Sequence, residues 1–258
     1  MDFGKIVGDS FEYAKEGLVG HWVKWIVLII LSLLPLIPIL LGLGAGVLAA
    51  MVAPVMLIPT IIVTIIIAII LALPLMGYVL RIYRGTVPAP EVDNWGLLFG
   101  DGFKLLVATI IYAIPVIIIG VVVFGSALVT IVMASSQNLA NPNALLGMFG
   151  AVIFGMVILA IVAFIIWLIV ATACVRLART NSIGEAFNFG EIFSHIGKIG
   201  WANYIVALII MCLIVGIVTF ILELIPYVGL ILVLIVSPFI AIFQARYLCL
   251  LYDSAGTA

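Results

Sequence analysis

Five arginines are the residues whose type and spacing most suggest chemistry. Arg81 and Arg84 stand three positions apart in the sequence, and so do Arg176 and Arg179. Residues with this spacing point the same way on a helix, and a guanidinium group can bind phosphate through two parallel hydrogen bonds. Together with Arg246, these arginines are candidate contacts for a lipid headgroup or another phosphate. The alternative, which the sequence alone favours, is that they only anchor the topology of a membrane protein.

Other chemistry-bearing motifs are absent from the sequence. It has no G-x-S-x-G and no H-E-x-x-H, and its two histidines, His21 and His195, lack a second ligand at helical metal spacing. The three cysteines also fit no metal or redox spacing. We therefore predict a protein that is not an enzyme and that holds no metal and no cofactor.

The composition is that of a membrane protein. Hydrophobic residues make up 67% of the chain and charged residues 8%, against about 25% charged residues in soluble domains. A net charge of −1 provides no basic field for nucleic acid. Runs of ~20 apolar residues are long enough to cross a bilayer as helices. Six such stretches are present, at about 25–43, 52–80, 105–134, 144–175, 202–222 and 227–248.

The basic residues predict how the spans are oriented. All ten Lys and Arg residues lie before the first stretch, in every second connection, or at the end of the sixth. The connections near 44–51, 135–143 and 223–226 contain none. Because short cytoplasmic loops retain Lys and Arg, we expect a cell-membrane protein with both termini in the cytoplasm. The string Gly42-x-Gly44-x-Gly46 is interpreted as a tight turn in the first outer connection.

An internal repeat indicates how the spans are grouped. Positions 94–99 (NWGLLF) match positions 188–193 (NFGEIF) at a constant offset, which also pairs Lys104 with Lys198. The same offset pairs Asp101 with His195, so this position is expected to be solvated. We predict an all-α integral membrane protein with six transmembrane helices as three repeated hairpins. The single membrane domain, 1–258, would contain units at about 1–84, 91–179 and 185–252.

Each hairpin is expected to follow a short amphipathic helix. Such helices lie at the headgroup boundary, with aromatic side chains on the acyl side and charges toward water. The predicted interfacial anchors are aromatic: Phe3, Trp95, Phe99, Phe189 and Phe193.

Three of these features resemble a known family. They are the exit Gly77-Tyr78-x-x-Arg81, the acidic-Trp-Gly-x-x-Phe segment that ends at Phe99, and an apolar helix opened by Gly and Lys104. The chain resembles an uncharacterised family of polytopic membrane proteins, common in archaea, whose domain has no known function. In repeat layout alone it is distantly similar to the membrane domains of some glycerophosphodiester phosphodiesterases. The resemblance implies a membrane-integral protein and no catalytic residues.

The expected function is that of a lipid-interacting or scaffolding membrane protein. Its partners would be membrane lipids and, beyond those, further copies of the chain or other membrane proteins, but not nucleic acid. A transporter or channel for a small, weakly polar or amphiphilic solute is the alternative, and it would need Ser, Thr and Gln244 to converge on one cavity. An enzyme would instead need acids such as Glu91, Asp93 and Asp101 to meet a lipid phosphate beside Arg81.

Overall fold

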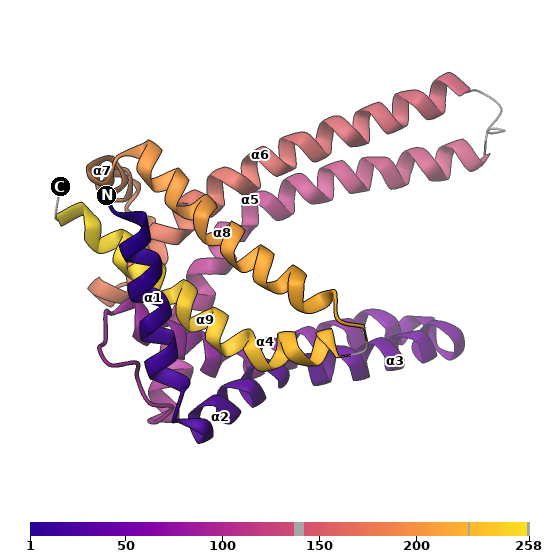
Figure 1. Ribbon diagram of the computed structural model, residues 1–258. Helices are drawn as coiled ribbons and strands as arrows, with labels where there is room; N and C mark the ends of the chain where they lie inside the picture. Colours follow the sequence, from indigo (N-terminus) through magenta and orange to yellow (C-terminus); the bar gives the residue numbers. More distant parts are fainter. Residues whose placement is uncertain (137–141, 227, 257–258) are drawn as a thin grey trace. The chain divides into compact units, whose positions relative to one another are not determined.

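The computed structural model describes residues 1–136, 142–226 and 228–256. These residues form helices and contain no strand (Figure 1). The α-helices are α1 (Phe3–Leu18), α2 (Trp22–Leu33), α3 (Leu36–Val52), α4 (Leu57–Tyr83), α5 (Trp95–Ser136), α6 (Pro142–Thr180), α7 (Phe189–Ile199), α8 (Trp201–Glu223) and α9 (Gly229–Asp253). Short 3-10 turns complete the list: η1 (Pro54–Met56), η2 (Gly184–Phe187) and η3 (Ser254–Gly256).

Among the described residues, six helical segments are long and apolar enough to cross a membrane, as the sequence predicted. The candidate spans are Trp22–Val52, Pro54–Tyr83, Trp95–Ser126, Gly150–Thr180, Trp201–Glu223 and Gly229–Gly256. The all-α class and the number of spans are therefore confirmed by length and composition. The predicted outer connection near 135–143 falls largely on residues 137–141, which lie outside the described residues.

The chain divides into two compact units. The first contains residues 1–106 and 172–258, and the second contains residues 107–171. In the second unit α5 and α6 run side by side (Figure 1). There the absence of a side chain at Gly155 lets Val123 pack closely against α6, since a Cβ at position 155 would lie 2.7 Å from two carbons of the Val123 side chain. The single domain 1–258 stays a prediction.

Helix α9 lies at the centre of the first unit and contacts α1, α2, α4 and α8. Its last turns bury Tyr247, Cys249 and Leu251. The hydroxyl of Tyr247 donates to the backbone carbonyl of Ala207 in α8 at 2.8 Å, and the Cys249 thiol lies 3.1 Å from the carbonyl oxygen of Ile82 in α4. Buried polar atoms thus meet backbone carbonyls, which lowers the cost of placing them among apolar side chains.

Two glycines bring α4 and the start of α5 into backbone contact. A Cβ at Gly77 would lie 2.0 Å from the carbonyl oxygen of Leu98, and a Cβ at Gly102 would lie 2.0 Å from that of Leu73. Small residues permit such close helix approach in membranes. This crossing fixes the last turns of α4 against the first turns of α5.

The structure corrects two sequence predictions about boundaries. The string Gly42-x-Gly44-x-Gly46 is not a turn, because α3 continues to Val52. Gly42 instead packs on α4, where its Cβ would lie 2.2 Å from Thr64 Oγ1. No charge or strong turn residue ends the helix before Pro54, so the backbone keeps its internal hydrogen bonds.

The second correction concerns the short amphipathic helix expected before each hairpin. Gly20 and Gly200, with φ of 89° and 90°, separate α1 from α2 and α7 from α8. Between the two, Trp95 opens one continuous helix that runs to Ser136. The repeat aligns Gly200 with Leu106, which cannot adopt the positive φ of that break as readily. The second amphipathic segment is therefore not a separate helix.

The close approach of α4 and α5 gives a stability prediction. We expect Gly102→Ala to destabilise the protein by about 1–3 kcal/mol, because the added carbon would force two backbones apart. The matched control is Gly100→Ala, two residues earlier in α5, where nothing lies within 4 Å of the added carbon. It should be neutral or stabilising by up to about 1 kcal/mol, from helix propensity. Thermal unfolding in detergent measures both, and equal melting temperatures would contradict the assigned contact.

Candidate functional site

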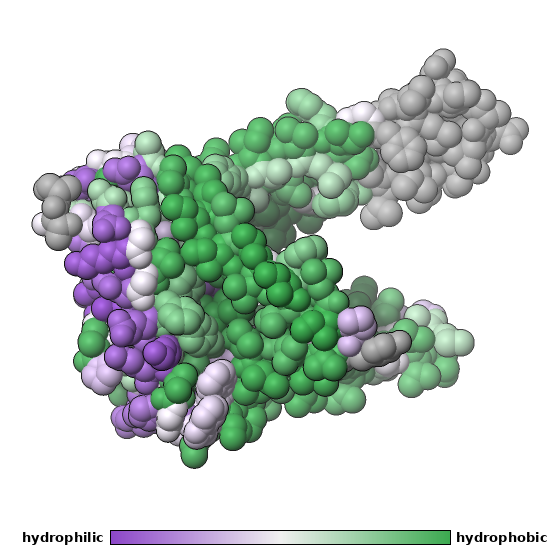
Figure 2. All heavy atoms as spheres, viewed as in Figure 1, coloured by the Kyte–Doolittle hydropathy of each residue, from purple (hydrophilic) through white to green (hydrophobic). Residues whose placement is uncertain are grey.

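Charged and polar side chains gather at one end of the first unit, over α1 and α7 and the end of α9, while most of the visible remainder of that unit is apolar (Figure 2). We call this the polar end. It comprises α1, the loop 84–94, α7, and the last turns of α4, α6 and α9. Four of the five candidate arginines meet a carboxylate there.

The arginines of α4 bind the loop and helix that follow them. Arg81 Nη1 donates to Asp93 at 2.7 Å and, at 3.3 Å, to the backbone carbonyl of Glu91. Arg84 forms a two-pronged ion pair with Asp101, with both nitrogen–oxygen distances at 2.6 Å. Asp101 is only 7% exposed, so the expectation that this position is solvated was wrong. The cause is the α4–α5 crossing, which places the carboxylate against Arg84.

The arginines of α6 are engaged in the same way. Arg176 donates to Glu185 through both Nε and Nη2. Arg179 binds both carboxylate oxygens of Asp253, at 2.8 and 2.9 Å, beyond the end of the third hairpin. Its guanidinium also lies against Gly85, where a Cβ would be 2.7 Å from Nη1. These contacts tie the ends of α4, α6 and α9 together.

Arg246 differs from the other four. Its guanidinium carbon lies 4.7 Å from the centre of the Tyr13 ring, which is a cation–π distance. Among the described residues no carboxylate lies within ion-pair distance of it, and its buried Nε has no hydrogen-bond partner. Tyr13 donates to the Thr86 carbonyl at 2.7 Å, and burial raises the pKa of this phenol to about 12.

His195, aligned with Asp101 in the repeat, has a different role. Its ring stacks on Tyr252 with 3.7 Å between ring centres, and Nε2 lies 2.8 Å from the Tyr252 carbonyl oxygen. Burial lowers the pKa of His195 below its usual value, with Lys198 and Arg176 acting in the same direction. The imidazole therefore packs against the end of α9, with Nε2 donating to the carbonyl oxygen.

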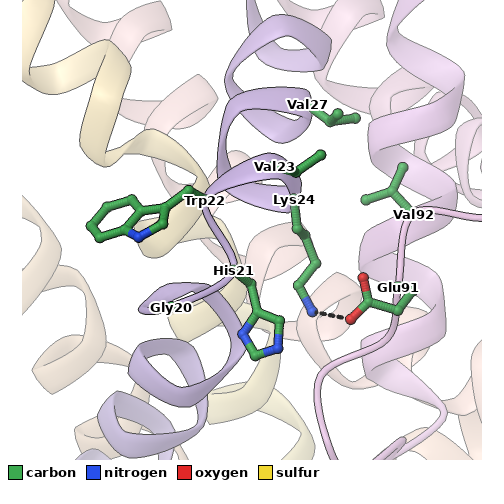
Figure 3. A pocket seen from close by; sticks show the side chains of 8 residues that line it. All are labelled: Gly20, His21, Trp22, Val23, Lys24, Val27, Glu91 and Val92. Atoms are coloured by element: carbon green, nitrogen blue, oxygen red, sulfur yellow. Dashed lines mark hydrogen bonds and ion pairs between the residues drawn. The ribbon is translucent and has the colours of Figure 1, made fainter.

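Lys24 joins the first span to the loop 84–94. Its side chain is 5% exposed, and Nζ lies 2.9 Å from Glu91 Oε1 and 3.4 Å from the carbonyl oxygens of Ala89 and Pro90. An open cavity of about 410 Å³ lies beside this pair. Its walls come from the start of α2 and from the loop (Figure 3), and the lining residues are Gly20, His21, Trp22, Val23, Lys24, Val27, Glu91 and Val92.

The predicted aromatic anchors are largely exposed on the first unit. Trp95, Phe99, Phe189 and Phe193 are 38–47% exposed, whereas Phe3 is half-buried. Phe193 contacts both Phe189 and Trp201, with 6.4 and 6.0 Å between ring centres. The rings form one exposed aromatic cluster at the start of the fifth span.

The described residues contain no group of three or more His, Cys, Asp or Glu side chains that could hold a metal ion. The sequence found the arginines but missed their partners, and it missed the Lys24–Glu91 cavity. The one available signal was that ten of the eleven acids share the polar segments with the bases.

One family matches the chain, through residues 60–227, and it is described as "Protein of unknown function (DUF4013)". No curated protein and no solved structure matches. Because the match covers more than half of the 258 residues, the chain belongs to this family. The predicted resemblance to an uncharacterised family is thereby confirmed.

The two carboxylates that bind the α4 arginines should differ in their contribution to stability. We expect Asp101→Asn to cost on the order of 3 kcal/mol, because it leaves Arg84 partly buried without its counter-ion. Asp93→Asn is the control. The Asp93 side chain is 61% exposed, and Arg81, although only 13% exposed, keeps the backbone carbonyls of residues 91, 93 and 94 as acceptors, so we expect a loss of about 0–1 kcal/mol. Chemical denaturation in detergent measures the difference. Equal losses would show that the buried pair does not hold the α4–α5 crossing.

Proposed function

We propose that this member of the family is a non-enzymatic, multi-pass protein of the cell membrane that interacts with lipid through its spans and acts as a scaffold. The observation that carries the proposal is how little of each span the chain itself covers. In each of the four spans of the first unit, only 6–28% of the most apolar 18-residue stretch is buried within the protein. Such a surface needs lipid or another apolar partner around it.

The aromatic residues support a defined boundary between lipid and water. Trp22, Trp95 and Trp201 are the first residues of α2, α5 and α8, next to the polar end, and each is 45–62% exposed. Tryptophan is enriched at the headgroup level of membranes. We infer that α1 and α7 lie along this boundary as interfacial helices, and that the three hairpins are repeats of one unit.

The polar end would face the cytoplasm, with both termini there. The basic residues it contains support this orientation, since Lys and Arg are retained on the cytoplasmic side. Labelling of loop positions from each side of the membrane tests the assignment. An archaeal source and the distant likeness to membrane domains of some glycerophosphodiester phosphodiesterases stay predictions.

The arrangement of the hydroxyl groups favours the lipid proposal over the transporter. Ser32, Thr60 and Ser237 each donate to a backbone carbonyl three or four positions earlier. The hydroxyls of Ser32 and Ser237 also lie 3.4 Å apart, between α2 and α9. Side chains used in this way satisfy the backbone of one helix and do not by themselves line a polar path. The alternative of a transporter or channel for a small amphiphilic solute has no comparable support.

The ion pairs bear on the enzyme alternative in the same way. Asp93 and Asp101, two of the acids that a reaction on a lipid phosphate would use, bind Arg81 and Arg84. Each carboxylate is engaged by a guanidinium group, so these acids suit structure better than proton transfer.

Native mass spectrometry of the protein released from its own membrane tests the proposal. We expect lipid to be retained in defined stoichiometry, and copies of the chain to remain associated where scaffolding uses them. Protein that is folded, bare and monomeric would contradict the proposal.

Because Arg246 alone among the candidate arginines has no carboxylate partner in the described residues, Arg246→Gln should lower the amount of retained anionic lipid several-fold. Arg81→Gln is the control and should leave it nearly unchanged.

A further inference from the structure

We propose that the cavity beside Lys24 and Glu91 binds the headgroup of a zwitterionic lipid that carries a phosphate and a primary ammonium. The inference rests on the proposed function, which it makes specific, because it names one site and one lipid class. The cavity has a volume of about 410 Å³, which lies within the usual range of ligand pockets, about 300–1,000 Å³.

The charge of the cavity selects the headgroup. Its lining contains one cation, Lys24, and one anion, Glu91, so its formal charge is zero. An anionic headgroup would meet the carboxylate of Glu91, and a purely cationic group would meet Lys24. A headgroup with both charges can meet both side chains. Its ammonium would lie at Glu91, and its phosphate would lie beside the positive charge of Lys24, whose three N–H groups already have acceptors in Ala89, Pro90 and Glu91.

The two side chains differ in exposure in a way that fits this orientation. The Lys24 side chain is 5% exposed and sits deep, held by Glu91 and by the carbonyls of residues 89 and 90. The Glu91 side chain is 62% exposed, and only its Oε1 receives the Lys24 bond. Its second oxygen can accept hydrogen bonds from an ammonium group, which a quaternary ammonium could not donate.

The helix start adds a second contact for the phosphate. His21, the residue that precedes α2, makes no side-chain capping bond to the first turn. The first N–H groups of a helix have no acceptor within it and favour anions. They lie next to Lys24, which is in the first turn of the same helix.

The apolar part of the lining fits the glycerol and first methylene groups of a lipid. Val23, Val27 and Val92 lie on one side of the Lys24–Glu91 pair and His21 on the other (Figure 3). Val23 and Val27 are one helical turn apart on α2, which continues into the first span. The lining therefore changes from polar to apolar along the direction in which a lipid would lie.

Binding of defined lipids to the delipidated, full-length protein tests the proposal by native mass spectrometry. The probes are phosphatidylethanolamine, phosphatidylcholine and phosphatidylglycerol at equal concentration. We expect the wild type to prefer phosphatidylethanolamine. Glu91→Gln should lower its affinity for that lipid by about three- to fivefold, the size of a partly exposed ion pair. The same change should not lower the affinity for phosphatidylglycerol, because its anionic headgroup would no longer meet a carboxylate.

Two further variants separate binding from folding. Asp93→Asn breaks an ion pair of the same loop, but residue 93 does not line the cavity. This variant should keep the lipid preference. Val23→Trp fills the cavity at a side chain that is 78% exposed, so it should fold normally and lose the preference.

The outcomes distinguish this site from the general function. Lipid retention without any preference for phosphatidylethanolamine, or with the same preference in Glu91→Gln, would overturn the site and leave the proposed function standing. Absence of retained lipid of every class would overturn both. Equal affinity for soluble glycerophosphoethanolamine would overturn the assignment to a lipid, because the apolar walls would then contribute nothing.

Discussion

The constraint on which the rest of this structure depends is the cost of placing a charge in hydrocarbon. An isolated Lys, Arg or Asp at the bilayer centre costs several kcal/mol, and the chain places all of its bases in the segments that flank the spans. Among the described residues, five of these ten bases also bind a carboxylate: Lys24, Arg81, Arg84, Arg176 and Arg179. This pairing adds to the helix contacts of the spans and holds the loop 84–94 and the ends of α4, α6 and α9 together.

The loop 84–94 shows how pairing produces a site. Arg81 and Lys24 reach it from different helices, and each binds both a side chain and a backbone carbonyl. The loop is thereby held against the start of the first span. The space beside Lys24 exists because a long side chain, and not a close helix contact, sets the separation there. In contrast, Gly77 and Gly102 remove all space between α4 and α5.

The sequence predicted the spans and the location of the charges, because both follow from local properties. A run of ~20 apolar residues is visible without any knowledge of packing, and so is the absence of bases from alternate connections. The partner of each arginine depended instead on tertiary packing. Asp101 was expected to be solvated, but the glycine crossing of α4 and α5 buries it against Arg84.

The prediction of a tight turn at the glycine string of α3 was wrong for a related reason. In water Gly42, Gly44 and Gly46 would favour a turn, but a backbone within a membrane must keep its hydrogen bonds. The ion pair between Lys24 and Glu91 could not be predicted either, because the two residues are distant in sequence and only the folded loop brings them together.

Two-sided cysteine labelling tests the central claim, that the segments with Lys and Arg share one face of the membrane and the turns without them lie on the other. Val87 in the loop 84–94 and Leu224 at the end of α8 are 67% and 63% exposed. In a background with Cys174, Cys212 and Cys249 changed to Ala, Leu224→Cys should react with an impermeant reagent in intact cells. Val87→Cys should react only after the membrane is opened. Labelling of both positions from the same side would contradict the account.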